Sequence, residues 1–269
     1  MLSNDYPGSI MTTWRLYLLV LFSVLVLVGC GPDRSNQAED TADTPPPTEA
    51  PAEHAPEAEA EEAVDEAIDE SAAEEAAVHV LVIGNSIAAG YGLDPDESFP
   101  ARLQERADDQ GWDVHITNAG LSGDTTAGGL NRLPWLLQTP VDIVVLELGG
   151  NDGLRGIDPQ TTRSNLMAMV DTTQARYPNA QVLLAGMQVP PNMGQEYADA
   201  FRDVFPDVAN AHDAVTLIPF VLDGVGGEPD LNQADGIHPT AEGQRIVADN
   251  VWEYLAPMLE SNLNQPATG

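Results

Sequence analysis

Between Val78 and Leu259, short apolar runs alternate with longer amphipathic segments. The runs are rich in β-branched residues and end at glycine or polar residues, which is typical of buried strands. The longer segments repeat their apolar positions every three or four residues, which indicates helices. Strands that alternate with helices predict a parallel sheet with helices on both faces. We therefore expect one α/β domain here, with no internal repeat and no second folded domain.

Five strands and five helices are expected in this region. The strands are Val78–Ile83, Asp113–Asn118, Val141–Leu148, Gln181–Met187 and Ala214–Ile218. The helices are Glu97–Gln110, Thr125–Gln138, Thr161–Tyr177, Gln195–Asn210 and Ala241–Leu259, the last with Thr240 as its N-cap. In parallel sheets, ligands bind beyond the carboxyl ends of the strands. Polar residues just after the first three strands are therefore the first candidates for chemistry.

An apolar run near the N-terminus predicts export. Leu16–Val28 contains 13 residues, apolar but for Ser23, with Arg15 before it and Gly29 after it. This run is too short for a stable transmembrane helix and has the layout of a signal peptide, with charge, apolar core and small residues in order.

The end of this run resembles a bacterial lipobox. In Leu27-Val28-Gly29-Cys30 the cysteine occupies the position that is lipidated in such signals, and it is the only cysteine of the chain. Residues 1–30 are therefore expected to be a lipoprotein signal peptide. The mature protein would be secreted across the inner membrane and anchored to the bacterial envelope through Cys30. Gly31 follows in place of the aspartate of an inner-membrane retention signal, which favours the outer membrane. A plain signal peptide and a retained anchor helix stay open.

Residues 31–77 are acidic and of low complexity, with 16 Asp or Glu against one Arg. Such a segment cannot bury enough apolar surface to offset its ordering entropy, so we expect a disordered tether that charge repulsion extends. The whole chain has a net charge of −33 and no lysine. This charge argues against nucleic acid as a partner, because phosphate binding requires clustered cations. It also suggests function at high salt, which screens self-repulsion.

Four segments combine glycines with small polar side chains. Glycine lets the backbone approach a ligand closely, and loops held by a rigid sheet commonly carry function. Three of the segments follow the first three expected strands, and the fourth precedes the last helix. They are Gly84–Gly90, Asn118–Asp124, Gly149–Gly153 and Asp235–Pro239.

Acyl transfer needs the residue types that these segments supply. A serine hydroxyl such as that of Ser86 becomes a good nucleophile when an imidazole takes its proton. His238 can be this base, and Asp235 can fix the tautomer and orientation of its ring. The oxyanion that forms needs donors already in place, which the backbone N–H groups of Ser86 and Gly123 and the side-chain amide of Asn151 can provide.

Each of these residues has a simpler interpretation when taken alone. Ser86 can be a turn residue, Asn151 a capping residue, and the Asp235–His238 pair part of a turn or a weak metal pair. The coincidence of four polar segments at one edge of a parallel sheet favours the catalytic interpretation. The other histidines, His54, His79, His115 and His212, are interpreted as surface or packing residues.

In this order, the segments resemble the sequence blocks of the SGNH (GDSL) hydrolases, most closely the branch of periplasmic thioesterases/lysophospholipases and arylesterases. The blocks are Gly84-Asn85-Ser86, Ser122-Gly123-Asp124-Thr125, Gly149–Gly156 and Asp235–Pro239. The resemblance implies a three-layer α/β/α sandwich with a five-stranded parallel sheet, the flavodoxin-like SGNH hydrolase fold. This domain would span residues 78–262, with residues 263–269 as a C-terminal tail. The resemblance implies the same catalytic and oxyanion-hole residues as the chemical argument.

One position departs from the family pattern. The family usually has aspartate before the catalytic serine, where this chain has Asn85. The amide is nearly isosteric but neutral, so a hydrogen bond that a carboxylate accepts would weaken. Because this residue is not the acid of the triad, we expect retained activity with, at most, a shifted substrate preference.

The expected activity is hydrolysis of carboxylic esters or thioesters through an acyl-enzyme, without metal or cofactor, by a monomer. Lysophospholipids, acyl thioesters and aryl esters are the candidate substrates. Loop residues expected to line the acyl pocket are Leu154, Ile157, Val189, Pro190 and Met193, with Pro190–Tyr197 as a mobile lip. Two alternatives stay open: a carbohydrate O-deacetylase on the same scaffold, and a non-catalytic lipoprotein that binds lipid or glycan.

Overall fold

The computed structural model describes residues 77–264. The expected signal peptide with Cys30, nearly all of the expected tether and the last five residues lie outside this range. Within it, no helix is both long enough and apolar enough to cross a bilayer.

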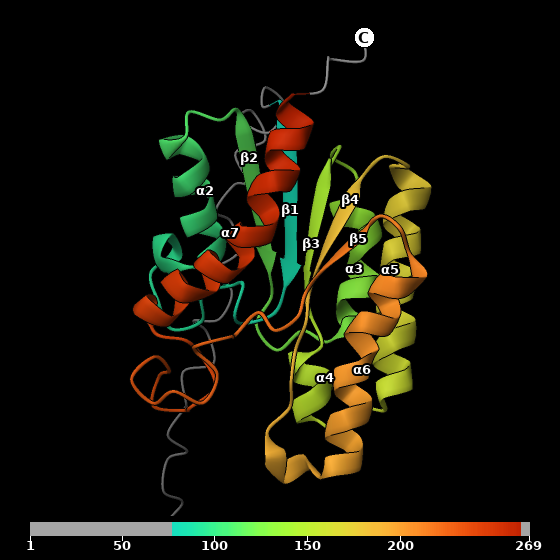
Figure 1. Ribbon diagram of the computed structural model, residues 1–269, viewed down its shortest axis with the longest axis vertical. Coiled ribbons are helices and arrows are strands. Elements are labelled where there is room, and N and C mark those ends of the chain that lie inside the picture. Colours follow the sequence, from blue (N-terminus) through green and yellow to red (C-terminus); the bar gives the residue numbers. More distant parts are fainter. Residues whose placement is uncertain (1–76, 265–269) are drawn as a thin grey trace, which may run out of the picture. The chain divides into compact units, whose positions relative to one another are not determined.

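Five parallel strands form one sheet in the order β2-β1-β3-β4-β5 (Figure 1). They are β1 (Val78–Gly84), β2 (Val114–Gly120), β3 (Ile143–Glu147), β4 (Gln181–Ala185) and β5 (Val215–Ile218). The chain adds β2 on one side of β1 and then crosses to the other side to add β3. The order of addition reverses there, and such a switch point is where open α/β sheets bind ligands. The expected five-stranded parallel sheet is confirmed.

Helices cover both faces of the sheet, so the domain has three layers (Figure 1). Helices α2 (Phe99–Asp109) and α7 (Ala241–Leu263) lie on one face. Helices α3 (Thr126–Leu136), α5 (Pro159–Arg176) and α6 (Gln195–Ala211) lie on the other. Three short elements were not expected from the sequence: the helix α4 (Gly150–Leu154) and the 3-10 turns η1 (Pro95–Glu97) and η2 (Pro191–Met193).

Side-chain caps explain where several helices begin. Thr240 accepts a hydrogen bond from the backbone N–H of Gly243, which confirms it as the N-cap of α7. Ser98, Thr125 and Asp158 cap α2, α3 and α5 in the same way. A capping side chain satisfies one of the N–H groups that the first helical turn leaves without a partner. Helix α7 continues to Leu263, four residues beyond its expected end.

The core lies along the three central strands. β1, β3 and β4 are apolar on both faces, as expected for strands covered by helices on each side. Phe201 and Phe205 of α6 pack edge to face in this core. Glu147, the last residue of β3, is an exception because its carboxyl group is fully buried.

Candidate active site

Three polar side chains form a continuous chain of hydrogen bonds at the carboxyl edge of the sheet. The Nε2 atom of His238 lies 2.9 Å from the Oγ atom of Ser86, and its Nδ1 atom lies 2.6 Å from Oδ2 of Asp235. Ser86 follows β1, whereas the other two residues precede α7. The structure thus places the three residues predicted from the sequence within hydrogen-bonding reach.

Short-range contacts hold the carboxylate of Asp235. Besides the imidazole of His238, it accepts the backbone N–H groups of His238 at 3.0 Å and Ile237 at 2.9 Å. Gly236, between Asp235 and Ile237, has a φ of +69°, a conformation that favours glycine. The bond from the His238 side chain, followed by those from the two backbone groups, holds the pKa of Asp235 below its usual range. Asp235 is therefore ionised at neutral pH and can stabilise a positively charged imidazolium.

The ring of His238 is also fixed from its other side. The ring of Tyr91 lies against it, with 4.5 Å between centroids. The side-chain amide of Gln233 donates to the backbone oxygens of Tyr91 at 2.7 Å and Pro239 at 3.0 Å. These contacts join the segment that carries the imidazole to the segment that follows Ser86.

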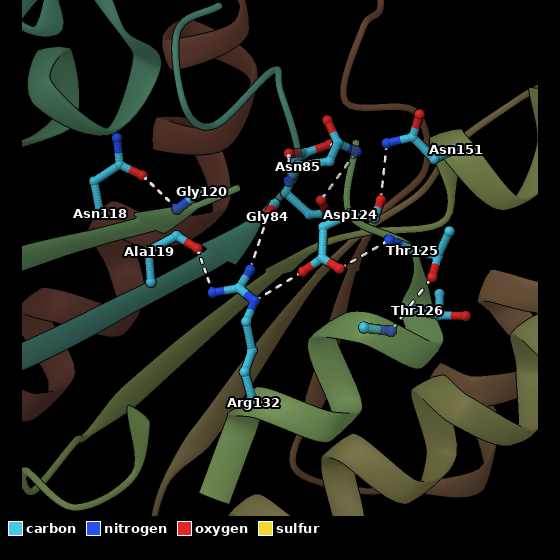
Figure 2. Close-up of polar contacts among 12 residues, drawn as sticks. Gly84, Asn85, Asn118, Ala119, Gly120, Asp124, Thr125, Thr126, Arg132 and Asn151 are labelled. Carbon is cyan, nitrogen blue, oxygen red and sulfur yellow. Dashed lines mark hydrogen bonds and ion pairs between the residues drawn. The ribbon is translucent and has the colours of Figure 1, made fainter. Parts of the chain in front are cut away.

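Candidate oxyanion donors come from the ends of three strands. Within residues 77–264, the backbone N–H groups of Ser86 and Gly123 have no hydrogen-bond acceptor, so both can donate to a ligand. The Nδ2 atom of Asn151 donates to the backbone oxygen of Asp124 at 2.8 Å (Figure 2). This bond uses one of the two amide hydrogens and fixes the orientation of the group, which leaves the second hydrogen for a ligand.

Arg132 of α3 ties these loops together (Figure 2). Its guanidinium pairs with Asp124 at 2.8 Å and donates to the backbone oxygens of Ala119 at 2.7 Å and Gly84 at 3.0 Å. One side chain thus joins the ends of β1 and β2 to the turn after Gly123. The sequence interpretation did not identify Arg132, because nothing in its local pattern distinguishes it from a surface arginine of an amphipathic helix.

A buried carboxyl group lies beneath Ser86. Glu147 accepts the backbone N–H groups of Asn85 at 3.0 Å and Ala88 at 3.2 Å on Oε2, and the Nδ2 group of Asn85 at 3.0 Å on Oε1. Burial raises the pKa of Glu147 to about 8, and the three donated bonds act in the opposite direction. The sequence interpretation missed this residue as well, because it ends an otherwise apolar strand.

Large apolar side chains are exposed in or directly after the segments that carry the polar groups. Of the five that are exposed among residues 77–264, Leu121 and Ile237 lie within such a segment, and Tyr91 and Leu154 directly follow one. We call these four the apolar rim: Tyr91, Leu121, Leu154 and Ile237, exposed by 51%, 54%, 41% and 46%. Of the other residues expected to line a pocket, Val189 packs where a side chain on Gly153 would lie. The expected mobile lip forms η2 and the start of α6; its mobility stays a prediction.

No metal site appears among the described residues. Within residues 77–264, no three or more His, Cys, Asp or Glu side chains gather as metal ligands would. His212 contacts Asp171 and the backbone oxygen of Val208, and His79 lies near Pro140. These histidines are not part of the cluster around Ser86.

Comparison with known proteins identifies esterases and related hydrolases as relatives of this chain. Residues 82–246 match the GDSL-like lipase/acylhydrolase family. Over 181 residues, 67% of this chain, the sequence is 49% identical to esterase TesA of Pseudomonas aeruginosa and 41% identical to an arylesterase of Vibrio mimicus, covering 89% of each. It is 38% identical to thioesterase 1/protease 1/lysophospholipase L1 of Escherichia coli K12, covering 84% of that protein. A crystal structure of TesA superimposes with a TM-score of 0.64 and 47% identity, over 67% of this chain and 99% of the other.

Proposed function

The chain belongs to the GDSL-like lipase/acylhydrolase family and is a serine hydrolase of the SGNH type, and on this premise we propose that Ser86 forms an acyl-enzyme. His238 takes the proton of the Ser86 hydroxyl as the oxygen attacks the ester or thioester carbonyl. It then gives this proton to the leaving alcohol or thiol. Asp235 accepts a hydrogen bond from Nδ1 and so keeps the imidazole in the tautomer whose Nε2 atom is free to take the serine proton.

The tetrahedral oxyanion is held by the N–H groups of Ser86 and Gly123 and by the amide of Asn151. Donors that are already oriented cost no reorganisation when the negative charge develops. Water then enters and its oxygen attacks the acyl carbonyl as His238 takes its proton. The second tetrahedral intermediate collapses to release the acid, and His238 returns the proton to the Ser86 oxygen. The observation that supports this assignment best is the chain of contacts at 2.9 Å and 2.6 Å from Ser86 through His238 to Asp235.

The apolar rim favours acyl or aryl esters over acetylated sugars. A sugar ring is recognised through hydrogen bonds, whereas an acyl chain or aromatic ring gains free energy by covering apolar surface. Relatives named esterase, arylesterase and thioesterase/lysophospholipase point the same way. Lysophospholipids, acyl thioesters and aryl esters are the proposed substrates, and a carbohydrate O-deacetylase is the alternative.

Chemical labelling and one substitution test the mechanism. A fluorophosphonate should label Ser86 and no other serine, as read by peptide mass spectrometry. Ser86→Ala should abolish labelling and lower turnover by on the order of 10⁶. Ser164→Ala removes an exposed serine of α5 and is the matched control. Label on another residue, or hydrolysis by Ser86→Ala at the rate of the control, contradicts the assignment.

A series of p-nitrophenyl esters and an acetylated xylan separate the two substrate classes. Each added methylene that is buried should raise kcat/KM, because burying one contributes about 0.8 kcal/mol. A preference for acetate on the sugar, with no gain along the acyl series, would favour the deacetylase.

We also propose that Cys30 anchors the enzyme to the envelope, with residues 31–77 as a tether and residues 78–262 as the hydrolase domain. The lipobox-like tetrapeptide and the acidic composition support this proposal. Radiolabelled palmitate should be incorporated into the wild-type chain and not into Cys30→Ser. Fractionation of the cell envelope should find the wild-type chain in the outer membrane. Equal incorporation by the variant, or an unlabelled wild-type chain, contradicts the anchor.

A further inference from the structure

Residues Asn85–Ala88, which we call the nucleophile turn, donate three hydrogen bonds to the buried carboxyl group of Glu147. The donors are the backbone N–H groups of Asn85 and Ala88 and the side-chain amide of Asn85, and among residues 77–264 no other hydrogen bond to this carboxyl group is found. Two donors meet Oε2 and one meets Oε1. Both oxygens therefore accept hydrogen bonds, and this arrangement favours the carboxylate against the burial that raises the pKa of Glu147 to about 8.

The orientation of the Asn85 amide is fixed independently of Glu147. Its Oδ1 atom accepts the backbone N–H of Ile87 at 2.9 Å. Rotating the amide by half a turn would set its NH₂ group against this N–H group, which is also a donor. The Nδ2 atom must then face Glu147, as observed.

Close packing and hydrogen bonds leave the nucleophile turn little room to change its conformation. A Cβ atom placed on Gly84 would overlap the side chain of Ala88 and lie 2.6 Å from Oε2 of Glu147. The amides of Asn118 and Gln244 hold the backbone oxygens of Ala88 and Ile87, each at 2.9 Å. Asn85 and Glu147 are both buried, and these contacts restrict movement of the turn around them.

From this hydrogen count we propose that Glu147 is a positioning residue for the nucleophile turn, and that the Asn85 amide supplies the hydrogen that closes their contact at every pH. The inference rests on the proposed role of Ser86 as the nucleophile. Glu147 acts through the turn, since the backbone groups that it binds flank Ser86 on both sides. An aspartate at position 85 would put two carboxyl groups in contact, and they would have to share a proton. Asparagine carries the needed hydrogen covalently, so no base can remove it.

Among residues 77–264, the other polar and charged side chains near the turn do not contact the carboxyl group of Glu147. Arg132 of α3 donates to the backbone oxygen of Gly84 and pairs with Asp124. His238, on the segment before α7, contacts Ser86 and pairs with Asp235. Asp152 of α4 is buried and accepts from Thr126. From α7, Gln244 presents a neutral amide. None of these groups supplies a proton to the contact between residues 85 and 147.

Exchanging the two residues tests the proposal. In the double variant Asn85→Asp/Glu147→Gln, the aspartate accepts the Ile87 N–H and the glutamine amide, while the glutamine oxygen accepts both backbone N–H groups. The three hydrogen bonds to the side chain at position 147 are restored and the net charge is unchanged, while the longer bond of 3.4 Å from the Asn85 amide to the backbone oxygen of residue 147 is lost. Glu147→Gln alone sets donor against donor at any pH. Asn85→Asp alone needs the shared proton, which it loses in alkaline solution. Asn210→Asp adds the same charge at an exposed site of α6 and is the control.

The measurements are kcat/KM from about pH 6 to about pH 10, and the rate at which a fluorophosphonate labels Ser86. Glu147→Gln should lose roughly 10- to 100-fold in kcat/KM at all pH values, as a buried unpaired donor does. Asn85→Asp should stay within about tenfold of wild type near neutrality and fall at least about tenfold further in alkali, where the two carboxylates repel. The double variant and the control should follow the wild-type profile, within about threefold.

Two outcomes overturn the inference and leave the proposed function intact. One is an Asn85→Asp profile parallel to that of the wild type, with Glu147→Gln fully active. The other is a double variant no more active than the worse single variant, whether or not it folds. A wild-type enzyme that hydrolyses no ester and takes no label on Ser86 contradicts the proposed function itself.

Discussion

The two segments that meet at the active site are held in place very differently. The nucleophile turn is buried, and its contacts reach residues far away along the chain, such as Asn118, Glu147 and Gln244. The histidine loop, residues 233–239, is largely exposed, and its central contacts lie within three residues, between Asp235 and His238. The serine is thus positioned by the fold, whereas the imidazole is positioned mainly by its own loop.

This difference predicts that substitutions in the two segments have different effects on activity and stability. Changes in the histidine loop should alter the chemistry while the domain keeps its thermal stability, because few contacts of the core are lost. Changes around the nucleophile turn and its neighbouring loops should lower both activity and stability. The substitutions below are therefore compared by their effects on kinetics and, where the contrast depends on it, on stability.

The largest effect is expected from Asp235→Asn. The amide presents a donor to the imidazole and favours the wrong tautomer, so kcat should fall on the order of 10⁴-fold. The Tm should stay close to that of Asp230→Asn, which alters an exposed aspartate nearby. A large fall in Tm would mean that the loop is coupled to the core more strongly than its contacts indicate.

Asn151→Ala should have the next largest effect. Loss of one oxyanion donor lowers kcat by about 10²–10³-fold with little change in KM, since the bond forms in the transition state. Steady-state kinetics with a p-nitrophenyl ester separate the two constants. A rise in KM at constant kcat would instead assign Asn151 to ground-state binding.

Arg132→Met tests the buried side of the comparison. The ion pair with Asp124 is mostly buried, with 20% and 7% of the two side chains exposed. Removing one partner should destabilise the domain by about 2–3 kcal/mol, somewhat less than for a fully buried pair, and lower kcat about tenfold. The pair of changes Arg132→Met/Asp124→Asn should cost less stability than Arg132→Met alone, because no unpaired charge stays buried. Urea denaturation measures both.

Tyr91→Ala should have the smallest effect. The ring packs on His238 but is half exposed, so its loss should lower kcat/KM about two- to tenfold without a change in Tm. Trp135→Ala removes another exposed aromatic side chain, on α3, which is 62% exposed against 51% for Tyr91, and its kinetics should match the wild type. If both variants lose activity equally, contact with the imidazole is not the cause.

Sequence patterns predicted the parts of this molecule whose signals are local. The apolar runs of β1, β3 and β4 identify strands because they are buried on both faces. Glycines beside Ser86, Gly123 and Asn151 mark loops at strand ends, so the sheet rule could bring these three residues together. Asp235 and His238 were identified from the needs of acyl transfer and from the family blocks. Some boundaries were wrong: β2 continues to Gly120, and β3 begins at Ile143 rather than at Val141.

What the sequence did not predict depends on which strands are neighbours. Glu147 meets the nucleophile turn only because β3 lies beside β1, although β2 comes between them along the chain. Arg132 reaches the backbone oxygens of both Gly84 and Ala119 because β1 and β2 lie side by side. Asn85 was identified as a departure from the family pattern, but its partner was not, because the register that brings Gly84 beside Glu147 is a property of the sheet.

The positions of the two proposed proton-transfer partners along the chain also determine when activity can arise. His238 follows Ser86 by 152 residues and directly precedes the final helix. A ribosome-bound chain therefore contains the hydroxyl long before it contains the imidazole. Under the proposed mechanism, hydrolysis becomes possible only when synthesis and docking of the last segment are complete, so an unfinished chain cannot cleave esters.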